Sequence, residues 1–481
     1  MASFKTMRRQ ALLFRLSRFL WAAVLVTLPV TNFRYFPFLG PTTLVRPLAA
    51  YPLFFLLVVL LLRWLWHRES FPWRNAMWPL LLFLFAWSVS TAFGPWLDPL
   101  PMRGQDYGAR SLRSWVTFGV GLTFFLAAIW MNQDEDSVRF TLRWLMAGLV
   151  LTLLWSAVQI VAFYTPWLSV ETVRRWQLAF SLRAPMKMGR ISGLTMEPSW
   201  FGAQLIALYL PWFFAILFER LSLTGRRVLD WLLGLLSVIV LLTTYSRSAI
   251  LIGVFALVLS VLLSARSEMY QAWQWFWRGF RGNGREQGIR LSLVLIFIGI
   301  LAFSGFFMAR NHYFAALWNV RAENLTDYLN KVYVGPRAAY AWSALKVWER
   351  SPLLGSGAGA SGFSMYHFLP EWVLTFVPEV AAQLSPQSTL FPNPKNLYAR
   401  LLSEGGLLGL AFFLLFWFHL LADILSLSRS SPLKRLLYRA AIFFFIVATF
   451  YNFTQDSLAQ PNLWVIPGIV LGGVPAERSS S

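Results

Sequence analysis

Long apolar runs recur along the whole chain and constrain its fold more than any other feature. Leu53 to Leu62 is apolar throughout, and several stretches approach or exceed about 20 apolar residues, the length that crosses a bilayer as a helix. In lipid, backbone polar groups must find partners within the protein, so only helices and closed barrels span. The runs do not alternate with polar residues, as barrel strands would. The sequence therefore predicts an all-α integral membrane protein.

About twelve transmembrane helices are predicted, with one large insertion between spans 9 and 10. Residues 1–309 hold spans 1–9, residues 310–395 form the insertion, and residues 396–481 hold spans 10–12 and a tail. The basic N-terminus starts an uncleaved first helix, because no small-residue cleavage site follows it. The expected spans are 17–33, 48–66, 76–94, 114–132, 141–165, 196–218, 228–245, 247–265, 290–309, 397–422, 436–453 and 462–475.

The distribution of basic residues predicts the orientation. With the N-terminus in the cytoplasm, 23 of the 42 Lys and Arg residues fall on the inner side, 11 in short outer loops and 8 in the insertion together with the start of span ten. Inner loops of membrane proteins are enriched in Lys and Arg. We therefore expect both termini inside and the insertion outside, facing the periplasm. A cysteine placed at Ser361, in the insertion, is expected to react with an impermeant thiol reagent.

Composition excludes several kinds of chemistry. The chain has no cysteine and four scattered histidines. It lacks both nucleotide-binding motifs, the Walker A loop and the Gly-x-Gly-x-x-Gly sequence after a strand. We expect no metal, no cofactor and no nucleic-acid partner. The net charge of +21 is mostly on the inner loops, where anionic membrane lipid accounts for it. An enzyme of this kind would take its energy from the substrate.

Arginines on the outer side, where positive charge is otherwise scarce, predict an anionic ligand there. Arg190 precedes Glu197, at the start of span six, and a helix N-terminus favours anions. Arg247 lies in a very short turn between spans 7 and 8. Arg337 lies in the first turn of a helix predicted from Gly335 to Trp348. The ordinary alternatives are an acid balanced by an arginine at a helix start, and side chains that reach lipid headgroups.

Two further segments allow alternative interpretations. The glycines from Gly355 to Gly359 let the backbone approach a ligand, or form a flexible linker. Asn396, Arg400 and Glu404 are four residues apart, so they share one face of span ten. Arg400 and Glu404 form either a functional group at membrane depth or a simple ion pair.

These elements, in this order, resemble the O-antigen polymerase and O-antigen ligase superfamily, integral membrane glycosyltransferases of GT-C-like type. The similarity runs from about residue 190 to 410. The matching residues are Arg190, Gly193, Glu197-Pro198-Ser199, Ser246-Arg247-Ser248, Arg337, Trp342, Pro352, Gly355, Gly357, Asn396-Leu397-Tyr398 and Glu404-Gly405-Gly406-Leu407-Leu408-Gly409.

The resemblance implies a hexosyltransferase of lipopolysaccharide or polysaccharide biosynthesis, whose donor glycan is carried on undecaprenyl pyrophosphate. Arg190, Arg247 and Arg337 would hold the pyrophosphate while an acceptor hydroxyl attacks the anomeric carbon. Ligases of the family usually carry a histidine where this chain has Lys395, and the Glu-Pro-Ser element looks more like the polymerases. We therefore predict a polymerase, with a ligase acting on lipid A-core or a protein as the alternative.

Glu197 is the predicted base, because it lies at an outer helix start next to the expected pyrophosphate site. His367 and Lys395 are the alternative bases. The substrate-binding candidates are Lys187, His367, Lys395, Asn396, Arg400 and Glu404. A transporter or flippase is the second alternative, but the paired broken helices and internal repeats typical of transporters are not evident. The sequence leaves open whether a chain-length regulator protein binds.

Overall fold

The computed structural model describes residues 2–35, 43–67, 69–184, 189–280, 284–310, 312–315, 320–332, 334–384, 388, 390–427 and 429–473. In these residues the chain is mostly helical and holds isolated bridges but no strand. Seven helical segments are long and apolar enough to cross a membrane, and two shorter apolar helices accompany them. The prediction of an all-α, multi-pass membrane protein is confirmed, while the count of twelve spans stays a prediction.

Each expected span falls on a helix, although some boundaries differ. The helices are α1 (Ala2–Thr27), α2 (Ala50–His67), α3 (Met77–Phe93), α4 (Tyr107–Met131), α5 (Glu135–Tyr164), α7 (Pro198–Gln204) with α8 (Leu210–Ile216), α9 (Arg227–Thr243), α10 (Arg247–Ser264), α12 (Gly284–Arg310), α19 (Leu397–Ser426), α20 (Pro432–Tyr451) and α21 (Pro461–Gly472). The first helix ends at Thr27 instead of residue 33. Pro29 explains this end, because the ring of a proline disfavours helical backbone before it.

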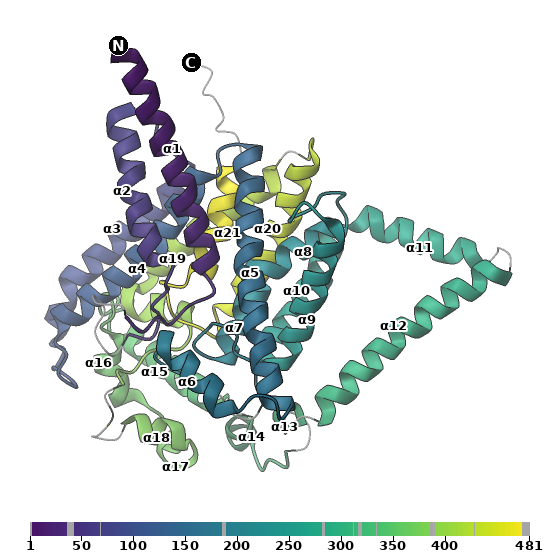
Figure 1. Ribbon diagram of the computed structural model, residues 1–481. Helices are drawn as coiled ribbons and strands as arrows, with labels where there is room; N and C mark the ends of the chain where they lie inside the picture. The colour runs from purple at the N-terminus through teal and green to yellow at the C-terminus, as the bar shows by residue number, and fades with distance from the viewer. Residues whose placement is uncertain are drawn as a thin grey trace.

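Two amphipathic helices were not predicted: α6 (Val170–Phe180) and α11 (Arg266–Phe280). Their apolar residues lie along one side, so neither gives the continuous apolar run of a span. Helix α11 leads into α12, and the two project from the bundle as an arm (Figure 1). Large apolar side chains of α12, among them Leu295, are exposed. Exposed apolar residues at these positions fit a helix that faces lipid.

The sixth expected span is the central helix of the bundle and contains an irregular turn. A π-helical turn, η2 (Leu205–Tyr209), separates α7 from α8, and Leu210 N–H donates to Leu205 O. Pro211 follows directly; it lacks an N–H and cannot continue a regular helical ladder. In this segment 83% of the residues are buried, including Trp212. The packing around it fixes the position of its first residue, which belongs to the candidate site.

Helix α19 is broken at Gly406, whose backbone is non-helical (φ 64°, ψ −165°). The glycine-rich turn fills the break: Gly357 N–H donates to Glu404 O (2.9 Å), and Leu407 N–H donates to Pro352 O (2.8 Å). A Cβ on Gly355 would lie 2.6 Å from backbone atoms of α19. The turn is therefore a structural joint and not a flexible linker, and the approach of its backbone to a ligand stays a prediction. The break itself was not expected.

The insertion packs against the start of α19, at the end of the bundle opposite the N-terminal end of α1 (Figure 1). The helix predicted from Gly335 is present and ends at Arg350. It packs with the short helices through Tyr340, Val347, Met365 and Val373. The periplasmic location of the insertion stays a prediction. Its elements are α13 (His312–Ala315), α14 (Leu325–Lys331), α15 (Gly335–Arg350), α16 (Ser361–Met365), η3 (Tyr366–Phe368), α17 (Glu371–Phe376) and α18 (Pro378–Leu384).

Candidate active site

Glu197 occupies the cap position of α7, in extended backbone just before Pro198. The sequence predicted this start, because proline suits the first helical turn. The loop before it is fixed by Gln159, whose side-chain oxygen accepts hydrogen bonds from the N–H groups of Ser192 and Gly193, both at 3.0 Å. The position of Glu197 is therefore set by a buried polar contact with α5 and by the packing of α7.

Hydrogen bonds from arginine side chains to backbone carbonyls join the three segments that carry the predicted arginines. Arg190 Nε donates to Thr244 O (2.9 Å), in the turn that leads to Arg247 at the start of α10. Arg247 Nη2 donates to Val332 O (2.7 Å), a few residues before Arg337 on α15. The structure thus gathers arginines from three distant parts of the sequence at the insertion end of the bundle.

Tyr451, at the end of α20, marks where these groups converge. Its hydroxyl is close enough to interact electrostatically with Arg337, Glu197 and Asp456, and it is hydrogen-bonded to Gln460. A cation and two carboxylates from three separate segments therefore lie within electrostatic range of one phenol. This mixture of charges suits a site that binds an anion and also moves a proton.

Arg337 and Glu197 have few partners among the residues that the structure describes. Arg337 is exposed and donates no hydrogen bond to any described residue. Glu197 Oε1 accepts a hydrogen bond from Ser199 Oγ, and no arginine in the described part of the chain forms an ion pair with it. The alternative of an acid balanced by a nearby arginine therefore gains no direct contact in support. Both groups keep hydrogen-bonding capacity for a ligand.

Lys395 lies next to this cluster, on the segment that enters α19. Its backbone N–H donates to Asp456 Oδ2 (3.0 Å), and its Nζ lies 4.8 Å from the ring centre of Tyr340, on α15 near Arg337. Asn396 caps α19 by accepting from Ala399 N–H (3.1 Å). The Asn396 side chain thus has a local structural task, whereas Lys395 brings a cation towards Arg337.

Arg400 and Glu404 form a buried ion pair with an Nε–Oε2 distance of 3.1 Å. Arg400 also donates to Asp456 O (2.7 Å) and Ser114 Oγ (2.8 Å). Ser361 Oγ donates to Glu404 Oε1 (3.3 Å) and is itself buried, so the expectation of an accessible Ser361 is wrong. These contacts tie α19 to α4 and α16, which is the simple ion-pair alternative considered from the sequence.

The two remaining candidates receive no support from the geometry. His367 is exposed on η3 and has no hydrogen bond to a described residue. Lys187 lies outside the described residues. Among the residues that the structure describes, no group of three or more His, Asp or Glu side chains is arranged to hold a metal ion.

Arg110 and Asp456 belong to the same region but were not singled out in the sequence. Arg110 Nε donates to Gly359 O (3.2 Å) and its Nη2 to Asn393 Oδ1 (2.8 Å), and its charge interacts with Arg400 and Asp456. Arg110 follows a loop expected on the outer side, where positive charge is scarce. It could therefore have been identified in the same way as the three predicted arginines. Asp456 carries no comparable signal, because its role depends on the fold of the α20–α21 loop.

Residues 232–414 match the family model described as O-antigen ligase. The match runs from α9 into α19 and includes Arg247, Arg337 and Lys395, but it begins after Arg190 and Glu197. It confirms the resemblance to the O-antigen polymerase and ligase superfamily over this part of the chain. Members of the family are glycosyltransferase-like enzymes of polysaccharide biosynthesis. No curated protein matches the chain.

Proposed function

We propose that this membrane protein is a polymerase that joins lipid-linked glycan units at the outer face of the inner membrane. The donor is a glycan on undecaprenyl pyrophosphate, and the acceptor is a sugar hydroxyl of a second lipid-linked unit. The observation that carries the proposal is the series of contacts that brings together the segments of Arg190, Arg247 and Arg337, with the charges of Arg337 and Glu197 both acting on Tyr451. The family match over two of these arginines supports it.

The proposed reaction forms one bond and breaks one. The acceptor oxygen bonds to the anomeric carbon, and the bond from that carbon to the pyrophosphate oxygen breaks. The electron pair of the broken bond leaves with the pyrophosphate, whose growing negative charge the arginines stabilise. Arginine suits this task because its planar fork matches phosphate oxygens and stays charged. The proton of the acceptor hydroxyl passes to Glu197.

The other candidates have supporting roles in this proposal. Lys395 binds the donor from the side of α15, because its Nζ lies over Tyr340 there. Asn396, Arg400 and Glu404 hold the start of α19 in place, because they contact other groups of the protein. No geometric observation adds support for substrate binding by these three residues or by His367, and Lys187 lies outside the described residues.

A ligase is the second candidate, favoured by the description of the matching family. It would use the same donor site and transfer the glycan to lipid A-core or a protein. Lys395 argues against it, because ligases of the superfamily usually carry a histidine there, and lysine is a poor base unless its pKa is lowered. The two reactions differ only in the acceptor, so product analysis separates them.

The test is reconstitution of the purified protein with a lipid-pyrophosphate oligosaccharide, without ATP or an ion gradient. A polymerase produces a ladder of longer lipid-linked glycans. If lipid A-core acceptor is needed for any product, the protein is a ligase. Movement of the donor across liposomes without any change in glycan length would show a flippase and refute both enzymes.

A further inference from the structure

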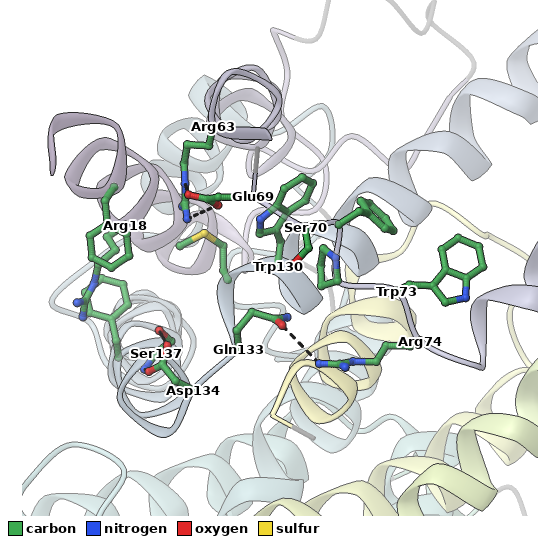
Figure 2. Close-up of a pocket in the computed structure, with 15 residues that line it drawn as sticks. Arg18, Arg63, Glu69, Ser70, Trp73, Arg74, Trp130, Gln133, Asp134 and Ser137 are labelled. Carbon is green, nitrogen blue, oxygen red and sulfur yellow. Dashed lines mark hydrogen bonds and ion pairs between the residues drawn. The ribbon is translucent and has the colours of Figure 1, made fainter. Parts of the chain in front are cut away.

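A cavity of about 530 Å³ lies at the other end of the bundle from the candidate active site. It is enclosed by α1, α2, the segment before α3, the end of α4 and the start of α5 (Figure 2). Helix α4 runs from the region of the candidate active site to the cavity. Tyr107, at its start, lies against Gly357, whereas Met131, at its end, lines the cavity. A 25-residue helix is roughly 37 Å long. The cavity is therefore not part of the donor site.

Two of the three arginines in the cavity wall have partners within the protein. Arg63 forms a two-pronged ion pair with Glu69, at 3.1 and 2.8 Å. Arg74 donates to Leu471 O (2.8 Å) and Gly472 O (3.3 Å) at the end of α21. Both arginines are thus used to hold the wall of the cavity together.

Arg18, on the opposite side of the cavity from Arg74 (Figure 2), has no such partner. It forms no ion pair or hydrogen bond with any described residue, and its guanidinium lies 4.1 Å from the ring centre of Phe140. The nearby acid, Asp134, caps α5 by accepting from Ser137 N–H and Oγ (both 2.8 Å). The lining therefore holds three arginines and two acids, a net charge of +1, and the Arg18 guanidinium keeps its hydrogen-bonding capacity for a ligand.

The remaining wall combines aromatic rings with unused donors. Neither the Ser70 hydroxyl nor the Trp130 indole N–H has a hydrogen-bond partner among the described residues. Large apolar side chains at the rim, such as Phe14 and Trp73, are exposed. The aromatic residues of the wall are Phe14, Phe71, Trp73, Trp130 and Phe140. Such a lining suits a ligand that is anionic at one end and apolar at the other, as aromatic belts at membrane interfaces do.

We propose that this cavity binds the phosphate headgroup of an anionic glycerophospholipid, with Arg18 as its principal donor. The acyl chains leave between α1 and α2, whose outward side chains, such as Phe19 and Leu61, are exposed and apolar. The charge bias of the loops places this end of the bundle in the cytoplasm, where anionic lipids are abundant and basic pockets between helices bind their headgroups. A free phosphate ion would leave the aromatic wall and the apolar rim without a function.

The test uses the full-length protein purified in neutral detergent, with bound lipid measured by native mass spectrometry and the melting temperature measured in parallel. Phosphatidylglycerol should bind and raise the melting temperature, and phosphatidylethanolamine should do so much less. Arg18→Ala should weaken phosphatidylglycerol binding by roughly tenfold or more, as expected when a hydrogen bond between charged groups is lost. Arg15→Ala removes the same charge from an exposed position on the same helix and should bind normally. Arg18→Lys should bind with intermediate affinity.

Two outcomes would overturn the proposal. If Arg18→Ala and Arg15→Ala weakened binding equally, the effect would be one of net charge and not of this cavity. If inorganic phosphate raised the melting temperature as much as phosphatidylglycerol, the cavity would be a site for a free anion. Neither outcome depends on catalytic activity, so the result is separate from that of the glycan assay.

Discussion

Removal of Arg337 separates catalysis from folding more cleanly than any other change at the candidate site. Arg337 is exposed, lies in the first turn of α15 and donates no hydrogen bond to a described residue. A cation at a helix N-terminus opposes the helix dipole by about 0.3–1 kcal/mol. Arg337→Ala should therefore leave the free energy of unfolding unchanged or slightly higher. Loss of a preorganised donor to a leaving pyrophosphate should instead raise the barrier by about 3–4 kcal/mol, roughly 100- to 1000-fold in kcat.

The matched control is Arg350→Ala, which removes the same charge from the last turn of the same helix. Arg350 is exposed, and its guanidinium lies 4.5 Å from the ring centre of Phe368, away from Tyr451. Turnover of a lipid-pyrophosphate oligosaccharide and the melting temperature should be measured for both variants. Wild-type turnover in Arg337→Ala, or equal losses of turnover in the two variants, would refute the assignment of Arg337 to the pyrophosphate.

Three other predictions concern the base, the topology and the ion pair between Glu268 on α11 and Arg439 on α20. Glu197→Gln should lower kcat at least about 100-fold with little change in KM, and a near-normal kcat would remove Glu197 from catalysis. A cysteine at His367, which is exposed, should react with an impermeant thiol reagent in intact spheroplasts, and labelling only after lysis would reverse the topology. Burial raises the pKa of Glu268, but the hydrogen bonds it accepts and the charge of Arg439 outweigh this and leave the pKa below its usual range. The ion pair between Glu268 and Arg439 therefore stabilises the protein at pH values above the ordinary glutamate pKa, and this stabilisation is lost as the pH falls through the lowered pKa of Glu268. Glu268→Gln should therefore flatten the fall in melting temperature between neutral and acidic pH.

Short sequence patterns predicted the parts of the site whose geometry depends only on residues close together in the sequence. Pro198 identified the start of the central helix and so the position of Glu197, and Pro336 in the same way accompanies the start of α15. The spacing of Arg400 and Glu404 placed them on one helix face, and the structure shows them paired. Each of these inferences needs only the geometry of a helix and its first turn.

Contacts between distant segments could not be predicted in the same way. Tyr451 ends an apolar helix and looks like an ordinary interfacial aromatic residue, and its electrostatic interaction with Arg337 arises only when α20 and α15 both pack against α19. The break in α19 has the same origin. Gly405 and Gly406 permit it, but the carbonyl of Pro352, from the insertion, accepts the hydrogen bond from Leu407 that the broken helix leaves open. A glycine pair in an apolar run does not reveal which segment will fill the gap.

Arg247 connects the bundle to the insertion, and this gives it a second task beside the proposed donor binding. Its Nη2 hydrogen bond to Val332 O holds the segment that leads into α15, and α15 carries Arg337. Arg247→Ala should therefore lose activity as Arg337→Ala does, and in addition loosen the insertion. Limited proteolysis of the insertion should be faster in Arg247→Ala than in Arg337→Ala, because only the first loses a contact between the two parts. Arg247→Lys keeps one charge but not the forked geometry, so it should restore part of the turnover at most. Equal proteolysis rates in the two alanine variants would show that the Arg247 contact does not position α15, and the coupling argued from it would fail.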